Sequence, residues 1–256
     1  MVKNDNPLAT PQDVLIALAL LSRLPVPEDQ AWARQANAAW AYPLVGVVLG
    51  GLAGLTGLLA MGLGLPAPLV ALITLTTLII LSGGMHEDGL ADTADGFWGG
   101  WDIARRLEIM KDSQIGSYGV IALVLSLAAR WVCLWLLWDA GSSAAIPAIL
   151  AGAVLSRAAM PVLMATLPHA RDTGLSHHVG RVSQSTALLG CGVAMAMALL
   201  LLGSSALWAA IGAALVVSGL AILARRKIGG QTGDVLGASQ QLAEITVLAC
   251  LLTGLA

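Results

Sequence analysis

The sequence predicts an all-α fold, a polytopic transmembrane helical bundle of about seven spans, and three observations support this prediction. Hydrophobic residues make up 57% of the 256 residues and charged residues only 11%, against roughly 45–50% and about 25% in a typical soluble domain. Apolar runs of about 20 residues, the length that crosses ~30 Å of hydrocarbon, recur along the chain. The basic residues fall on alternate connections between these runs. A soluble fold would expose large apolar patches to water and is disfavoured.

The elements follow from the apolar runs in chain order. The first run, 14–24, is too short to span and predicts an N-terminal interfacial or re-entrant helix. Seven longer runs follow, with six or eight spans as alternatives, and they form a single integral membrane domain, 1–256. The second and seventh runs are short and need a tilt, a kink or flanking residues to cross. The seven runs are Tyr42–Leu63, Pro68–Leu81, Val120–Trp138, Ala144–Leu167, Thr186–Leu202, Ala206–Ala224 and Leu242–Leu255.

Two patterns within the spans predict packing. Gly46, Gly50 and Gly54 repeat every four residues, which predicts a close contact between helices through one small-residue face. Trp131, Trp135 and Trp138 cluster near the outer end of the third span, which predicts an aromatic belt at the membrane surface.

Orientation follows from the basic residues, because lysine and arginine concentrate in short cytoplasmic loops. With the N-terminus inside, the inner connections hold eleven of the 13 basic residues and the outer loops hold none. The remaining two, Arg130 and Arg157, lie within spans. The inner segments are 1–41, 82–119, 168–185 and 225–241.

Acidic residues concentrate in one inner segment, 84–118, which holds seven of the 15. Asp88, Asp92 and Asp95 have i, i+4, i+7 spacing, which places three carboxylates on one face of a helix. Such like charges repel one another unless a cation neutralises them, and Mg²⁺ binds carboxylate oxygens together with substrate phosphates. The glycines after Asp88 and Asp95 permit close approach of a ligand. These features favour a metal site over the alternative, a solvated acidic face.

Cations follow the acidic stretch. Arg105 and Lys111 beside a carboxylate–metal cluster suit a phosphate-bearing substrate, with membrane anchoring as the alternative. Arg157 is costly inside an apolar span and is expected to face a polar cavity or a carboxylate. His86 stands two residues before Asp88, where it could act as a general base or donate a hydrogen bond beside the metal.

Two further inner segments are polar. The glycine-rich stretch 229–238 carries Asp234 and could present backbone N–H groups at the membrane surface, although a plain loop is the alternative. The segment 168–185 holds Arg171 and three histidines, for which substrate contact and mere solvation are equally plausible.

Several motifs occur together along most of the chain. The main one runs from Gly83 to Gly96, and the others are Arg23–Pro27, Pro43–Gly46, Glu108–Ser113 with Gly116 and Gly119, Ser156-Arg157, and Gly229–Ala238 followed by Glu244. In this order they resemble the cobalamin synthase family, adenosylcobinamide-GDP ribazoletransferase. One departure is Gln241, where the family pattern has an acid, so Glu244 or Asp234 must serve instead.

The resemblance implies a reaction in the nucleotide-loop assembly of vitamin B12. Adenosylcobinamide-GDP and α-ribazole, or its 5′-phosphate, would give adenosylcobalamin, or its phosphate, plus GMP. It implies Mg²⁺ as cofactor, corrinoid and α-ribazole as substrates, and a place in the bacterial cytoplasmic membrane with the active face toward the cytoplasm. The hypothesised roles are metal ligands Asp88, Asp92 and Asp95; substrate-binding Arg105, Lys111, Arg157 and Asp234; and catalytic His86 and Asp92, with His86 or one of the acids taking a hydroxyl proton.

Two other functions compete with this one. A CDP-alcohol phosphotransferase also uses spaced Asp and Gly residues, but its Ala-Arg pair is missing, since Ala91 precedes Asp92. A cation transporter predicts carboxylates spread through the spans, whereas here they cluster on one surface. A net charge of −2 offers no basic field for nucleic acid. The sequence leaves open a homo-oligomer and association with other cobalamin-assembly enzymes.

Overall fold

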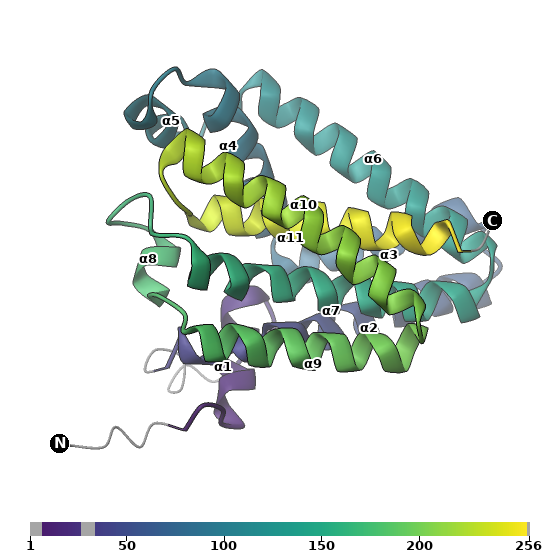
Figure 1. Cartoon of the computed structure of the whole chain (residues 1–256). Coiled ribbons are helices and arrows are strands. Elements are labelled where there is room, and N and C mark those ends of the chain that lie inside the picture. The colour runs from purple at the N-terminus through teal and green to yellow at the C-terminus, as the bar shows by residue number, and fades with distance from the viewer. Residues whose placement is uncertain (1–6, 27–33, 255–256) are drawn as a thin grey trace.

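The computed structural model describes residues 7–26 and 34–254, and over these ranges every regular element is a helix (Figure 1). The all-α prediction is confirmed. Three residues of the sequence interpretation lie outside the described residues: Lys3, one of the eleven basic residues of the inner segments, Pro27 of the first motif and Leu255 of the last run. The elements are α1 Gln12–Leu21, η2 Asn37–Ala41, α2 Tyr42–Gly62, α3 Ala67–Ser82, α4 Met85–Gly99, α5 Ile103–Ile109, α6 Ser117–Asp139, α7 Ser142–Thr166, α8 Leu175–Val179, α9 Gln184–Leu202, α10 Ser205–Ile228 and α11 Gly233–Leu252.

Within the described residues, six helices are long and apolar enough to cross a membrane: α2 with η2, α6, α7, α9, α10 and α11. Helices α3 and α4 pass the same test only as a pair bent by 85° at the break between them, and they add a seventh crossing if the pair counts as one span. The α3 arm carries the apolar residues, and polar α4 lies beyond it at the end of the bundle. This agrees with the predicted six to eight spans. Helix α1 is too short to cross, as expected.

The last span begins earlier than predicted. Helix α11 starts at Gly233, nine residues before the expected Leu242, and the Thr232 hydroxyl accepts a hydrogen bond from Val235 N at 3.3 Å to cap it. The polar residues Gln240 and Gln241, which make this stretch look like a loop, are each 1% exposed. They belong to a buried hydrogen-bond network, so the helix tolerates them inside the bundle.

Helix α7 is the centre of the bundle, since 89% of its apolar 18-residue stretch is buried inside the protein. It packs against α2 at the predicted small-residue face. A Cβ at Gly46 would collide with the backbone of Ala153, and one at Gly54 would lie 2.9 Å from Ile146 Cδ1. The close glycine contact is therefore confirmed. Bulkier residues would separate the two helices.

The predicted aromatic belt is wrong for Trp138. This side chain is 1% exposed, and its indole N–H donates to Thr74 Oγ1 at 3.1 Å. Trp131 donates to the Pro68 carbonyl at 2.9 Å. Since a buried indole needs a hydrogen-bond acceptor and α3 supplies one to each, these tryptophans join α6 to α3.

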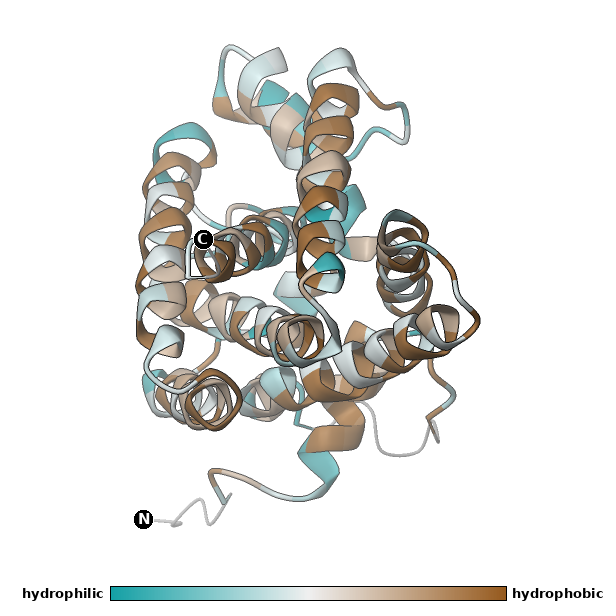
Figure 2. Cartoon of the chain, turned by 90° about the vertical axis from the view of Figure 1, so that its right-hand side faces the viewer, coloured by the Kyte–Doolittle hydropathy of each residue, from teal (hydrophilic) through white to brown (hydrophobic). Residues whose placement is uncertain are grey.

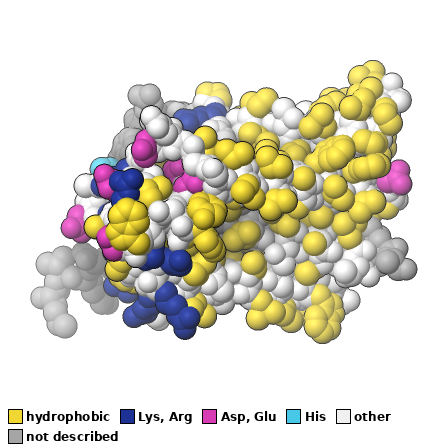
Figure 3. All heavy atoms as spheres, turned by 90° about the horizontal axis from the view of Figure 1, so that it is seen from above, with side chains coloured by type: hydrophobic (Ala, Val, Ile, Leu, Met, Phe, Trp, Pro, Cys, Tyr) yellow, Lys and Arg dark blue, Asp and Glu magenta, His cyan; other side chains and the backbone are white. Residues whose placement is uncertain are grey.

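Most of the exposed charge lies at one end of the bundle. Figure 2, seen from the opposite end, shows long helices with hydrophobic residues around much of their circumference, and Leu200 and Leu215 are 87% and 70% exposed. Figure 3 shows most of the charged side chains in view at the end where α4, α5 and α8 lie. We call this the charged end. The apolar sides suit contact with lipid, and the protein is an integral membrane protein.

Candidate functional site

The site is built on α4, which follows a glycine hinge. Gly83 and Gly84 both have φ of +69°, a left-handed conformation that glycine adopts without strain. The Arg23 side chain lies against Gly83, where a Cβ would collide with it. Two consecutive left-handed residues end α3 and turn the chain into α4, which directs a polar helix across the charged end.

Helices α4 and α11 meet through glycines. A Cβ at Gly89 would lie 2.8 Å from the Asp234 carbonyl oxygen, and one at Gly237 would lie 3.2 Å from His86 Cα. Only glycine permits such an approach without displacing backbone. The two inner segments predicted to be catalytic, 84–118 and 225–241, therefore come together. This packing carries Asp234 to the carboxylates of α4.

The carboxylates near the contact between α4 and α11 repel one another, because they carry like charges. Asp92 is half-buried. Burial, followed by the negative charges of Asp234, Asp88 and Asp95, raises the pKa of Asp92 to about 7. Arg171 offsets part of this charge, since its Nη2 lies 3.2 Å from Asp234 Oδ2. The group carries more negative charge than the protein neutralises, which suits a cation.

Asp95 has a structural partner that the sequence interpretation missed. It is 7% exposed and accepts hydrogen bonds from Gly116 N at 2.7 Å and Gly119 N at 2.9 Å. A Cβ at either glycine would collide with this carboxylate. The Asp95 side chain thus satisfies free N–H groups at the start of α6, which explains the two glycines of the motif.

No metal cage is closed in the part of the chain that the structure describes: nowhere in it do three or more His, Cys, Asp or Glu side chains gather closely enough to hold an ion. Asp88, Asp92 and Asp95 do lie on one helix, α4, as predicted. Their role as a ligand set stays a prediction.

Two cavities open on this group. The first, which we call the apolar cavity, holds about 210 Å³ and has Asp88, Arg171 and Asp234 among its lining residues. The second, which we call the polar cavity, holds about 350 Å³ and is lined in part by Asp88, Asp92 and Lys111. Asp88 lines both cavities. The two cavities therefore adjoin at this carboxylate.

The predicted cations differ in where they lie. Lys111 lines the polar cavity. The Arg105 guanidinium lines neither cavity and pairs with Glu108 at 2.7 Å, where the two side chains are 45% and 69% exposed. Arg171, which the sequence left undecided, belongs to the site instead. Its partner Asp234 is 63 residues away, and spacing alone gives no signal at that distance.

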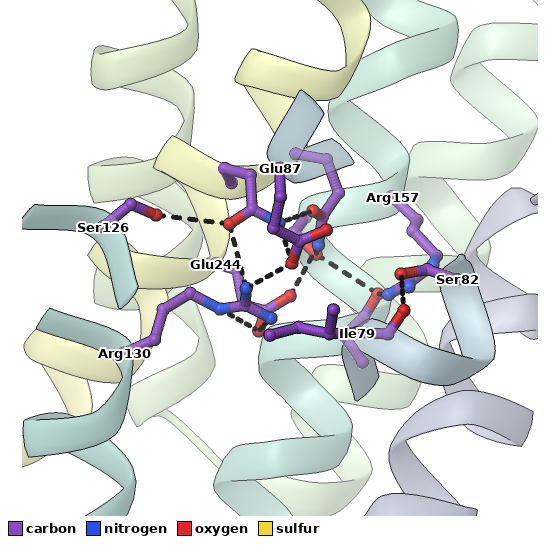
Figure 4. Close-up of polar contacts among 11 residues, drawn as sticks. Ile79, Ser82, Glu87, Ser126, Arg130, Arg157 and Glu244 are labelled. Atoms are coloured by element: carbon purple, nitrogen blue, oxygen red, sulfur yellow. Dashed lines mark hydrogen bonds and ion pairs between the residues drawn. The ribbon is translucent and has the colours of Figure 1, made fainter. Parts of the chain in front are cut away.

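A second charged group lies deeper in the bundle (Figure 4). Arg130 Nη1 lies 2.6 Å from Glu87 Oε1, and Arg130 Nη2 lies 3.0 Å from Glu244 Oε1. Gln241 accepts a hydrogen bond from Arg130 at 3.0 Å and donates one to Glu87 at 3.1 Å. We call Glu87, Arg130, Arg157, Gln241 and Glu244 the buried network.

Arg157 completes the buried network. It is 2% exposed, donates to the Ala153 carbonyl at 3.0 Å, and experiences the charges of Glu244 and Arg130. Among the described residues Arg157 forms no ion pair with a carboxylate, and Glu244 acts on it through its charge alone. Two arginines and two glutamates balance, so a neutral Gln241 fits where the family pattern has an acid.

Comparison with known proteins decides the family. The sequence model of the cobalamin-5-phosphate synthase family matches residues 13–252. The chain belongs to this family. The resemblance drawn from the motifs is therefore confirmed. Since the match includes both inner segments and every span, the cobalamin-5-phosphate synthase family supplies the whole fold and not one module of it.

Curated relatives agree with this assignment. A protein of Azorhizobium caulinodans named adenosylcobinamide-GDP ribazoletransferase is 45% identical over 250 residues, covering 92% of this chain and 93% of the relative. Proteins of the same name from Mesorhizobium japonicum and Brucella ovis are 42% and 40% identical, covering 92% of this chain and 91% and 94% of their own lengths. No solved structure matches the chain.

Proposed function

We propose that this protein is an adenosylcobinamide-GDP ribazoletransferase. A ribose hydroxyl of α-ribazole, or of its 5′-phosphate, attacks the phosphorus bonded to the cobinamide arm. A new P–O bond forms to the ribose, the P–O bond to GMP breaks, and GMP leaves. The observation that carries the proposal is the family match over nearly the whole chain, together with relatives of that name.

The geometry supports the same reaction. Phosphoryl transfer depends mainly on positioning the reactants and stabilising charge. The polar cavity offers Lys111 and the carboxylates to a pyrophosphate, and the apolar cavity adjoins it at Asp88. Donor and acceptor would meet at this junction.

Mg²⁺ is the proposed cofactor, and the unneutralised carboxylates fit it. Asp88, Asp92 and Asp234 would hold the ion, because Asp95 would first have to give up its two backbone hydrogen bonds. Carboxylate oxygens are the ligands that Mg²⁺ prefers. When bound, the metal neutralises charge on the pyrophosphate and on the leaving GMP.

The remaining predicted residues have different roles at the cavities and in the buried network. Lys111 contacts phosphate in the polar cavity, and Arg171 replaces Arg105 as the second cation, since it lies within the site. Arg157 acts through the buried network, which holds the start of α4. Asp92 takes the hydroxyl proton rather than His86, because Asp92 lines the polar cavity and the His86 side chain is only 2% exposed.

The charged end faces the cytoplasm in this proposal, in a bacterial cytoplasmic membrane. The basic residues support it, since eleven of the 13 fall in the predicted inner segments and none in the predicted outer loops. Both substrates carry phosphate or ribose groups and need water-filled access, which the charged end provides.

The test is GMP release by purified protein supplied with adenosylcobinamide-GDP and α-ribazole, with and without Mg²⁺. Wild-type protein should release GMP only when both substrates and the metal are present. Asp92→Asn should lower turnover by roughly 100-fold or more, whereas Asp139→Asn, the same change at the far end of α6, should not alter it. Normal turnover by correctly inserted Asp92→Asn would rule out the metal assignment, and no release by the wild type would rule out the function.

A further inference from the structure

The apolar cavity has walls suited to a flat aromatic ring. Tyr42 of α2 and Met160 and Met164 of α7 line it, together with Met85 at the start of α4. The first three are 2%, 3% and 2% exposed. Thioether sulfur makes favourable contacts with aromatic rings, and three methionines around one cavity offer several such contacts. The α8 residue Leu175 lines the cavity as well.

Two buried nitrogens of residues that line this cavity have no partner, His86 Nε2 and Arg171 Nη1, and Arg171 is already paired with Asp234 through its other terminal nitrogen. His86 lines the cavity, is 2% exposed, and its Nε2 makes no hydrogen bond. Ser176, another polar lining residue, already donates to Gln231 Oε1 at 2.6 Å. A buried polar atom without a partner costs free energy, so a ligand that hydrogen-bonds to His86 gains affinity from a group the protein leaves unsatisfied.

We infer that the apolar cavity binds the aromatic base of the acceptor nucleoside and that His86 recognises the free ring nitrogen of this base. The inference rests on the proposed function. α-Ribazole is a ribose joined to dimethylbenzimidazole, two fused rings with two methyl groups and one unprotonated ring nitrogen. In the tautomer with its proton on Nε2, His86 donates to that nitrogen.

The guanine of the donor fits this cavity less well. Guanine carries several donors and acceptors, and the methionine, leucine and valine side chains that form much of the wall would leave those that do not meet Asp88, Arg171 or Asp234 without a partner. A benzimidazole presents one acceptor, which matches the unpartnered Nε2 of His86, while Arg171 stays paired with Asp234. With the base held here, the ribose extends toward Asp88, which stands two residues after His86 and also lines the polar cavity.

The first test compares two acceptors in the full-length protein, α-ribazole and its indole analogue, in which a C–H group replaces the free ring nitrogen. Wild-type protein should favour α-ribazole by about 10- to 100-fold in kcat/KM, the effect of losing one buried hydrogen bond. His86→Leu should abolish this preference while turnover of the indole analogue stays within about threefold of the wild type. His86→Gln, which keeps an N–H donor, should restore part of it.

The second test fills the cavity. Met164→Trp should raise the KM for α-ribazole by about tenfold or more and leave the KM for adenosylcobinamide-GDP unchanged. Met195→Trp is the matched control, since Met195 lines a separate groove between α7, α9 and α10. That variant should change neither KM. If Met164→Trp does not fold, the His86 series decides alone.

The outcomes separate the inference from the function. A wild-type protein that turns over substrate, with His86→Leu keeping the full preference for α-ribazole, overturns the inference alone. So does an equal loss with both acceptors, which would assign His86 to proton transfer, and so does a folded Met164→Trp with an unchanged KM. A wild-type protein without turnover overturns the proposed function and the inference with it.

Discussion

In the buried network, we expect that losing the negative charge of Glu244 destabilises the protein, whereas placing that charge at a neighbouring position restores part of the stability. Glu244 accepts hydrogen bonds from Arg130 Nε at 3.1 Å and Nη2 at 3.0 Å, and also from Gln240. Glu244→Gln would leave Arg130 and Arg157 facing a single carboxylate, Glu87. Removing one partner of a buried ion pair typically costs about 3–5 kcal/mol, so the apparent melting temperature should fall on the order of 10 °C.

Gln241 provides the compensating change. Its Oε1 lies 3.0 Å from Arg130 Nη1, so Gln241→Glu places a carboxylate beside the same guanidinium. Alone, this variant adds a third acid to two arginines and should be destabilised, because the extra buried charge has no partner. Combined with Glu244→Gln, it restores the balance of two acids and two bases. The double variant should therefore be more stable than either single variant.

Thermal unfolding in detergent or lipid nanodiscs, followed by tryptophan fluorescence, measures all four proteins. Glu108→Gln is the control, since Glu108 forms an ion pair in which its side chain is 69% exposed, and exposed pairs contribute about 0–1 kcal/mol. A double variant that melts no higher than Glu244→Gln would refute the charge-balance reasoning. It would show that the geometry of the Glu244 side chain, and not its charge, stabilises the network.

Three further predictions follow from single contacts. Asp95→Ala removes two hydrogen bonds at the start of α6 and should destabilise the protein by about 1–3 kcal/mol, seen as faster amide exchange around Gly116. Gly46→Leu forces α2 away from α7 and should abolish insertion of stable protein, measured as yield of monodisperse protein on size exclusion. Burial alone would raise the pKa of Asp13, but hydrogen bonds from Arg34, Trp40 and Thr10 outweigh it and hold the pKa below 3.8. The stability that this carboxylate contributes is therefore present above pH 3.8 and is lost as the pH falls below it. Asp13→Asn should flatten the acid limb of a profile of melting temperature against pH.

The sequence was sufficient for the fold class because lipid imposes one rule on every span. Backbone groups must pair within the helix, so long apolar runs predict helices with few alternatives. Prediction from apolar runs fails where part of a span is polar. The first nine residues of α11 resemble a loop, since the compensating groups of Gln240 and Gln241 lie on other helices. Trp138 was misplaced for the same reason, because its acceptor Thr74 is 64 residues away.

Site residues show the same division between local and distant information. The carboxylates of α4 were predicted to share a helix from spacing alone, and they do. The partners of Asp95 lie 21 and 24 residues further on, beyond any helical period, so its link to α6 was invisible. Arg171 carried no local signal either. Glycines were the informative residues in retrospect, because Gly89 and Gly237 mark where α4 and α11 touch.

Three consecutive residues at the start of α4 connect these observations. Successive side chains on an α-helix point about 100° apart, and here His86 lines the apolar cavity, Glu87 joins the buried network and Asp88 lines both cavities. The network holds Glu87 from α6 and α11, so it fixes the rotation of α4 about its axis. Any rotation that releases Glu87 from Arg130 would also turn Asp88 away from the junction. The balanced charges deep in the bundle therefore set the position of Asp88, the carboxylate proposed to hold the metal at its surface.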